Sequence, residues 1–160
     1  MGVLHDAVHL EEKAERAYRE AASQTHDPSA RALFTLLAES EAAHAAVLKT
    51  FGHVADLQGP DLVAQAREWV RGAVEGNAGV LSPDARVVDI LRRAADVERE
   101  AEAFYRHHAE RATEARTAEL LAELAKIERG HYALVSSLVE YYNRPYEWTE
   151  SAEFGLRPEY

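Results

Sequence analysis

The sequence predicts an all-α protein in which four long helices form a bundle of two antiparallel hairpins joined by a long connection. The composition favours helix, because the 160 residues are rich in Ala, Leu, Glu and Arg but include only eight glycines and five prolines. Apolar residues recur at helical spacing along four segments. A pattern of Glu, Tyr and His positions also occurs twice at a constant offset of 87 residues (98 − 11), which indicates two copies of one hairpin.

The first hairpin is predicted to span residues 3–51. Its first helix covers residues 3–23. Asp27 and Pro28 then match a helix start, because aspartate is a favoured N-cap and proline fits the first helical position. The second helix runs to residue 51. Gly52 is its expected stop, since glycine readily adopts the left-handed conformation that ends many helices.

The second hairpin follows the same plan. Ser82, Pro83 and Asp84 repeat the start signal, and the third helix continues to about residue 111. Thr113 or Thr117 can cap the fourth helix, which is expected to end near residue 142. Each helix exceeds twenty residues and so spans roughly 30–40 Å at 1.5 Å per residue. Short turns within each pair make both hairpins antiparallel.

The long connection between the hairpins occupies about residues 52–81. Its middle, residues 61–74, has the pattern of a short amphipathic helix with Trp69 as a packing anchor. Residues 1–142 are therefore expected to form one bundle domain, a length sufficient for a real core. Residues 143–160 contain Trp148 and other aromatic residues, and we expect an irregular tail packed on the bundle.

Composition also narrows the functional classes. The chain has no cysteine, which excludes disulfides, thiolate metal sites and iron–sulfur clusters. Its formal net charge of −10 disfavours nucleic acid or an anionic membrane as the main partner. No apolar run is long enough to span a bilayer, and charged residues appear too early for a secretion signal. Asp6 breaks the myristoylation pattern. A soluble cytoplasmic protein is therefore expected.

The repeated pattern carries the chemistry. Each hairpin holds a Glu, a Tyr seven residues later, a second Glu thirty residues after the first, and a His three residues further. The first copy is Glu11, Tyr18, Glu41 and His44, and the second is Glu98, Tyr105, Glu128 and His131. At 100° per residue these positions lie on the apolar seams of their helices, where converging carboxylates need cations to offset their burial. Four glutamates and two histidines are a ligand set for two ions of iron, manganese or zinc in a bundle core.

Two other interpretations stay open. Glu15 and Glu102 also obey the 87-residue offset and lie near the first ligands on the helical wheel, but Arg19 and Arg106 follow each by four residues. An ion pair at the bundle edge explains them better than an extra metal ligand. A duplicated bundle that has lost its metal is the alternative for the whole site.

Four segments resemble the four helices of rubrerythrin-type ferritin-like proteins: LEEKAERAYREAA, ALFTLLAESEAAH, VEREAEAFYRHHA and LLAELAKIERGH. The resemblance covers about residues 3–142 and implies a ferritin-like four-helix bundle that binds two iron ions, with manganese possible. The metal ligands that it implies are Glu11, Glu41, His44, Glu98, Glu128 and His131. It further implies that Glu41 and Glu128 bridge both ions, and that Tyr18 and Tyr105 donate hydrogen bonds to ligand carboxylates. Core packing is the alternative role of the two tyrosines.

The chain departs from the rubrerythrin pattern in two ways. Rubrerythrins typically carry a further Glu three residues after the third-helix ligand, where this chain has Ala101, and Ala14 holds the matching place in the first helix. The resemblance therefore does not imply the redox-dependent iron movement associated with that Glu. Rubrerythrins also usually append a Cys-rich rubredoxin domain, which a chain without cysteine lacks. The resemblance thus implies an external electron donor.

These observations predict a dimetal oxidoreductase of the peroxidase or ferroxidase type that reacts with H2O2 or O2. The metal centre itself would be the catalyst, with no further catalytic side chain and no other cofactor. Iron binding or storage in a multi-subunit assembly is the alternative function, and a structural bundle stabilised by its metal is a third. A homodimer or higher homo-oligomer is expected.

Overall fold

The structure is a computed structural model that describes residues 2–26, 28–57, 64 and 85–154. Four long helices occupy these ranges: α1 (Val3–Gln24), α2 (Pro28–Thr50), α4 (Ala85–Ala109) and α5 (Ala115–Phe154). A short 3-10 helix, η1 (Val54–Leu57), follows α2. The arrangement confirms the predicted all-α four-helix bundle.

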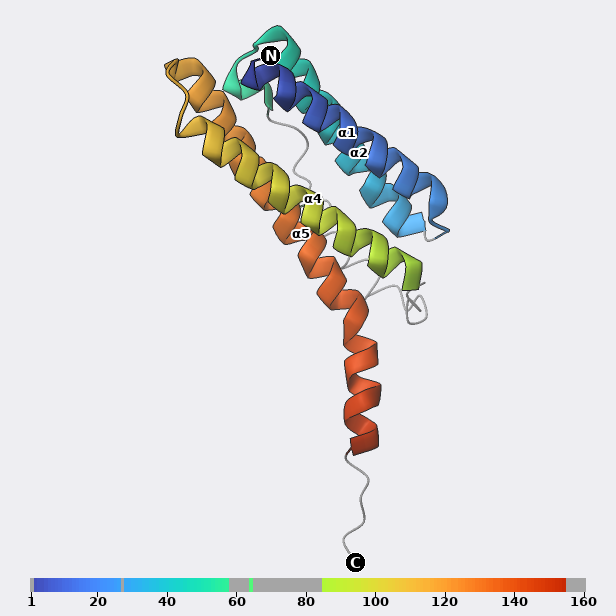
Figure 1. Ribbon diagram of the computed structural model, residues 1–160. Helices are drawn as coiled ribbons and strands as arrows, with labels where there is room; N and C mark the ends of the chain where they lie inside the picture. Colours follow the sequence, from blue (N-terminus) through green and yellow to red (C-terminus); the bar gives the residue numbers. More distant parts are fainter. Residues whose placement is uncertain (1, 27, 58–63, 65–84, 155–160) are drawn as a thin grey trace, which may run out of the picture.

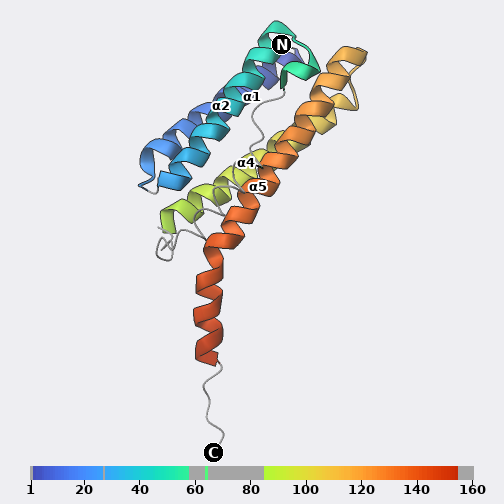
Figure 2. The same cartoon turned by 180° about the vertical axis from the view of Figure 1, so that it is seen from behind.

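The helices pair as the duplicated pattern predicts. Helix α1 packs along α2 and α4 packs along α5, so each pair is an antiparallel hairpin, and the two hairpins lie side by side with α1 facing α4 (Figures 1 and 2). The start of α1 and the turn between α4 and α5 lie at the same end of the bundle. None of the described helices combines the length and apolarity needed to cross a membrane.

The end of α2 differs in detail from the prediction. The residue with a positive φ is Phe51 (φ 47°), and Gly52 follows it. The Gly52 N–H donates to the Val47 carbonyl (2.9 Å) and the Phe51 N–H to the Leu48 carbonyl (3.2 Å), which is the bond pattern of a Schellman ending. A Cβ at Gly52 would lie 3.2 Å from both Val47 Cγ1 and Asp56 Oδ2, so a larger residue would require these side chains to shift by a few tenths of an ångström.

The start of α5 also differs from the prediction. The helix begins at Ala115, and the carbonyl of Glu114 accepts the Ala118 N–H at 3.0 Å. Thr117 is therefore the third helical residue, not the cap, and its hydroxyl donates to the Glu114 carboxylate at 2.9 Å. The cap position belongs to Glu114, so neither predicted threonine occupies it. Asp27, residues 82–84 and the segment around Trp69, for which start signals and a short helix were predicted, lie outside the described residues.

The predicted end of the fourth helix is wrong. Helix α5 does not stop near residue 142 but continues as helix to Phe154. No glycine interrupts residues 143–154, and Pro145 removes only one backbone donor, which can bend a helix without ending it. The last turns of α5 run beyond the end of the bundle and do not fold back on it, in contrast to the irregular packed tail expected there (Figures 1 and 2). Residues 155–160 lie outside the described part.

Two apolar clusters divide the bundle interior along its length. One includes Phe34, Leu37, Leu91 and Val135, and the other includes Leu48, Leu121 and Leu124. On every long helix, the first and second clusters occupy opposite sides of the Glu or Glu/His positions of the repeated pattern. The polar positions therefore form one layer that is sealed by apolar packing above and below.

Candidate metal centre

The structure brings all six predicted metal-ligating residues together in this polar layer. They come from all four helices: Glu11 from α1, Glu41 and His44 from α2, Glu98 from α4, and Glu128 and His131 from α5. Each is at most 5% exposed. Burial of four carboxylates in one layer is unfavourable unless positive charge compensates them.

The six side chains form two overlapping groups of possible metal ligands. The first group is Glu11, Glu41, His44 and Glu128, and the second is Glu41, Glu98, Glu128 and His131. Within each group, one ligand atom per residue lies within 4.8 Å of the others. Glu41 and Glu128 belong to both groups, so the two possible metal positions share their carboxylates.

Each imidazole presents Nδ1 to three carboxylates. His44 Nδ1 lies 3.3 Å from Glu11 Oε2, 3.4 Å from Glu41 Oε2 and 3.4 Å from Glu128 Oε1. His131 Nδ1 lies 3.2 Å from Glu41 Oε1, 3.2 Å from Glu128 Oε2 and 3.7 Å from Glu98 Oε2. The two rings are nearly parallel, with an interplanar angle of 15° and centroids 5.8 Å apart. Each possible metal position is thus faced by one imidazole nitrogen and several carboxylate oxygens.

The two tyrosines connect the hairpins. Tyr18 on α1 donates a hydrogen bond to Glu98 Oε1 on α4, and Tyr105 on α4 donates one to Glu11 Oε1 on α1. Burial raises the pKa of both hydroxyls, and the nearby carboxylates raise it further, so both remain protonated donors. Both tyrosines therefore have the predicted contact with a carboxylate of the cluster in addition to their packing in the core. Such a contact orients a carboxylate for metal binding.

Protons distribute unevenly over the carboxylates. Burial raises the pKa of Glu11 and Glu98 well above the usual range of glutamate. Burial also opposes ionisation of Glu41 and Glu128, but close contacts with neighbouring side chains outweigh it and lower the pKa of both. For Glu41 these neighbours are Glu11 and both histidines, and for Glu128 they are the two histidines.

The histidines hold the compensating charge. Burial disfavours an imidazolium, but the surrounding carboxylates outweigh that effect and raise the pKa of His44 and His131 well above the usual value. In the absence of a metal ion, protons on these histidines and on Glu11 and Glu98 thus balance the ionised Glu41 and Glu128. Metal ions would replace those protons, because ligands must be deprotonated to bind.

Two carboxylate oxygens indicate that the cluster fits cations. Glu41 Oε1 and Glu128 Oε1 are buried without a hydrogen-bond partner among the described residues. Glu41 Oε1 lies close to His131 Nδ1 but lacks the alignment of a hydrogen bond. An unsatisfied buried carboxylate oxygen is costly, and a bound cation would remove that cost. The all-oxygen-and-nitrogen ligand set suits iron or manganese.

Ser40 is a contact residue that the sequence analysis missed. Ser40 is 4% exposed, and its hydroxyl oxygen lies 3.3 Å from His44 Nε2 and 3.4 Å from His131 Nε2. One oxygen thus serves both rings on the side opposite the carboxylates, which holds Nδ1 of each ring toward the centre. The repeat gave no signal for it, because adding 87 to 40 gives Ile127. A polar residue directly before Glu41 in an apolar helix was the available clue.

The remaining candidates lie at the bundle edge. Arg19 Nε contacts Glu15 Oε1 at 2.8 Å, and Arg106 contacts Glu102 Oε1 at 3.3 Å. Both arginines are more than half exposed, and neither glutamate belongs to a ligand group. The ion-pair interpretation of Glu15 and Glu102 therefore agrees with the structure.

Comparisons with known proteins agree with this geometry. The profile of the family described as Rubrerythrin matches residues 2–139. A solved structure of a hypothetical protein from Pyrococcus furiosus superposes with a TM-score of 0.63 at 21% identity and covers 89% of each chain, which shows a shared fold. A search of curated proteins found no significant match. Because the family match spans most of its length, this chain belongs to the rubrerythrin family.

Proposed function

We propose that the protein is a diiron oxidoreductase that uses its buried centre to reduce hydrogen peroxide or to react with O2. The observation that carries the proposal is the pair of overlapping ligand groups that share Glu41 and Glu128. Two adjacent positions with common carboxylates suit a reaction that needs two electrons at once. Family membership supports a diiron-carboxylate centre.

The side chains of the cluster would hold the metal ions in place and balance their charge. Two ferrous ions would supply one electron each, and reduction of one H2O2 to two waters consumes two electrons and two protons. Glu41 and Glu128, already ionised, would offset the charge of both ions. Tyr18 and Tyr105 hold the carboxylates of Glu98 and Glu11 in place. Ser40 holds the two imidazoles.

The surroundings of the cluster determine what can reach it. The apolar layers above and below exclude bulk water, which strengthens each electrostatic contact inside. The sequence contains no cysteine for a thiolate-ligated electron-transfer centre. Reducing equivalents would therefore come from another protein or from a small reductant.

Anaerobic titration with ferrous iron tests the proposal. We expect two ions per chain, because the ligand groups define two positions. Separate addition of H2O2 and of O2 to the loaded protein should then oxidise both ions, and the faster reaction identifies the oxidant. Binding of one ion or none would contradict the dimetal centre. Iron uptake far beyond two per chain, together with a large native mass, would favour storage instead.

A further inference from the structure

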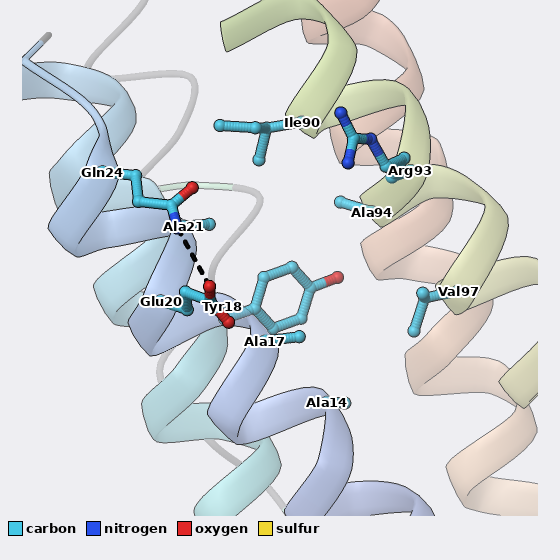
Figure 3. Close-up of a pocket in the computed structure, with 10 residues that line it drawn as sticks. All are labelled: Ala14, Ala17, Tyr18, Glu20, Ala21, Gln24, Ile90, Arg93, Ala94 and Val97. Carbon is cyan, nitrogen blue, oxygen red and sulfur yellow. Dashed lines mark hydrogen bonds between the residues drawn. The ribbon is translucent and has the colours of Figure 1, made fainter. Parts of the chain in front are cut away.

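An open pocket lies beside one half of the centre. It has a volume of about 240 Å³ and lies between α1 and α4 (Figure 3). Ala14, Ala17 and Ala21 of α1 face Ala94 and Val97 of α4 across it, so half of its lining residues are small and apolar. Polar side chains also line it: Glu20, Gln24 and Arg93. The short side chains leave the space open.

Tyr18 separates this pocket from the metal-ligating residues. Its ring lines the pocket and extends from α1 toward α4 (Figure 3), and its hydroxyl donates to Glu98 Oε1. Glu98 belongs to the ligand group that contains His131. One side chain and one hydrogen bond therefore lie between the pocket and that metal position.

Larger side chains stand at the equivalent positions beside the other half of the centre. Adding 87 to Ala17 and Ala21 gives Phe104 and His108 on α4. The Phe104 ring packs edge-on against Tyr105 with centroids 5.4 Å apart and lies 4.4 Å from the His108 ring. Both tyrosines are buried, with Tyr105 0% and Tyr18 3% exposed, so the two halves differ in the side chains beside the tyrosines. The tyrosines and glutamates of the two halves match, whereas the side chains that cover the tyrosines do not.

We infer that small uncharged oxidants, H2O2 or O2, reach the centre through the pocket at Tyr18, and that the side of Tyr105 is closed. The identity of the oxidant rests on the proposed function, while the route itself is a property of the chain. Passage requires the Tyr18 hydroxyl to leave Glu98 briefly, which makes Tyr18 the last barrier. Phe104 and His108 block the equivalent path.

Metal-free protein tests the route without any reaction. The seven tyrosines can be replaced by 3-fluorotyrosine, and the Tyr18→Phe and Tyr105→Phe variants assign two fluorine NMR signals. Dissolved O2 should enhance relaxation of the Tyr18 signal more than that of the Tyr105 signal. Ala17→Phe should reduce the enhancement at Tyr18 to the level of Tyr105. Equal relaxation enhancement of the two tyrosine signals in the parent protein would overturn the inference. This holds also if the cause is a second copy of the chain that covers the pocket.

Rapid mixing of ferrous-loaded protein with H2O2 and with O2 tests the route during reaction. Ala17→Phe should slow oxidation about tenfold or more with both oxidants, since it restores the blocking ring of the other half. Metal content should stay unchanged. Ala32→Phe, at an exposed position of α2, is the matched control and should react as the parent protein does. In the metal-free protein, Phe104→Ala should increase the relaxation enhancement by O2 at the Tyr105 signal. Ala17→Leu places a smaller side chain in the pocket and replaces Ala17→Phe if that variant folds poorly.

The two experiments separate the route from the function. Unchanged oxidation rates in Ala17→Phe, with iron oxidised normally, would overturn the route and leave the proposed function standing. A clear O2 effect at Tyr18 in metal-free protein, with no oxidation of bound iron, would keep the route and overturn the proposed function.

Discussion

The two helical hairpins agree at the centre and differ around it. Tyr18 and Tyr105 make reciprocal hydrogen bonds to Glu98 and Glu11, and the histidines present the same nitrogen to the shared carboxylates. One turn away the correspondence fails. A small pocket adjoins Tyr18, whereas the Phe104 ring covers Tyr105.

A second difference concerns the histidines. Ser40 in the first hairpin reaches both imidazoles, while its counterpart in the second hairpin is Ile127. Residues that would touch a metal ion must suit two similar positions, and so the duplication is preserved in them. Residues that control access to the centre, or that support its ligands, need to occur only once in the chain. Comparison of the halves therefore separates ligand positions from those that modify the centre.

The largest expected effect comes from the shared carboxylates. Glu41→Ala or Glu128→Ala should reduce metal binding below two ions per chain and slow ferrous oxidation by more than the about 10- to 100-fold typical of outer contacts. Each shared carboxylate faces both positions, whereas Glu11 and Glu98 face one each. Glu11→Ala and Glu98→Ala are therefore the matched controls and should cost less. Circular dichroism should show intact helices in all four variants, because removal of a buried carboxylate also removes its desolvation cost.

A prediction about Ser40 tests the asymmetric support of the histidines. Ser40→Ala should weaken metal binding about tenfold or more, since both imidazoles lose the contact that fixes their orientation. Ser40→Thr, which keeps the hydroxyl, should restore most of the affinity. Ile127→Ala, at the corresponding position, should lower the melting temperature through lost packing but leave affinity nearly unchanged. Competition titration with a chelator measures the affinity. Equal affinity in Ser40→Ala and the parent would remove Ser40 from the centre.

Much of the fold and of the six-residue cluster could be predicted from the sequence, because both depend on periodic features. Apolar spacing places the helices, and the 87-residue offset identifies side chains that must converge if two hairpins pack face to face. The resemblance to rubrerythrin-type proteins implied the contacts of Tyr18 and Tyr105 with carboxylates of the cluster. The ion pairs of Glu15 and Glu102 were distinguishable because Arg19 and Arg106 stand one turn further along.

Features that do not repeat along the sequence could not be predicted. Ser40 has no repeated partner, and its role depends on the tilt of two rings that only the packed bundle defines. The pocket depends on which side chains stand beside Tyr18, and an alanine in a helix carries no signal of open space. The continuation of α5 to Phe154 was not predicted, because this segment contains Pro145, and a proline weakens a helix locally but need not end it.

The reciprocal tyrosines offer a test of equivalence with a smaller effect. Tyr18→Phe and Tyr105→Phe each remove one hydrogen bond to a carboxylate of the cluster, and each should weaken metal binding by about tenfold. The two losses should be similar, because the contacts are reciprocal. Their effects on oxidation by H2O2 should differ, since only Tyr18 lines the pocket. Identical oxidation rates in both variants would indicate that the two halves are equally accessible.

The last prediction concerns pH. The pKa values of Glu11, Glu98, His44 and His131 are raised in the folded, metal-free protein. Each such group stabilises the fold fully below its unfolded pKa and loses that contribution as pH rises toward its folded pKa. The lowered pKa values of Glu41 and Glu128 matter only at acidic pH. The free energy of unfolding of metal-free protein should therefore fall from pH 5 to 8.

Glutamine variants connect this pH dependence to the two halves. Glu11→Gln and Glu98→Gln each replace a protonated carboxyl by a neutral side chain of similar shape, so each should remove up to about 1.4 kcal/mol per pH unit of the decline. Similar reductions are expected, because burial raises the pKa of both carboxyls. Urea unfolding of metal-free protein at pH 5, 6, 7 and 8 measures the slope. Glu123→Gln, at a glutamate paired with Lys126 on the surface of α5, is the control and should leave the slope unchanged. A slope that is the same in all variants would place the bound protons elsewhere.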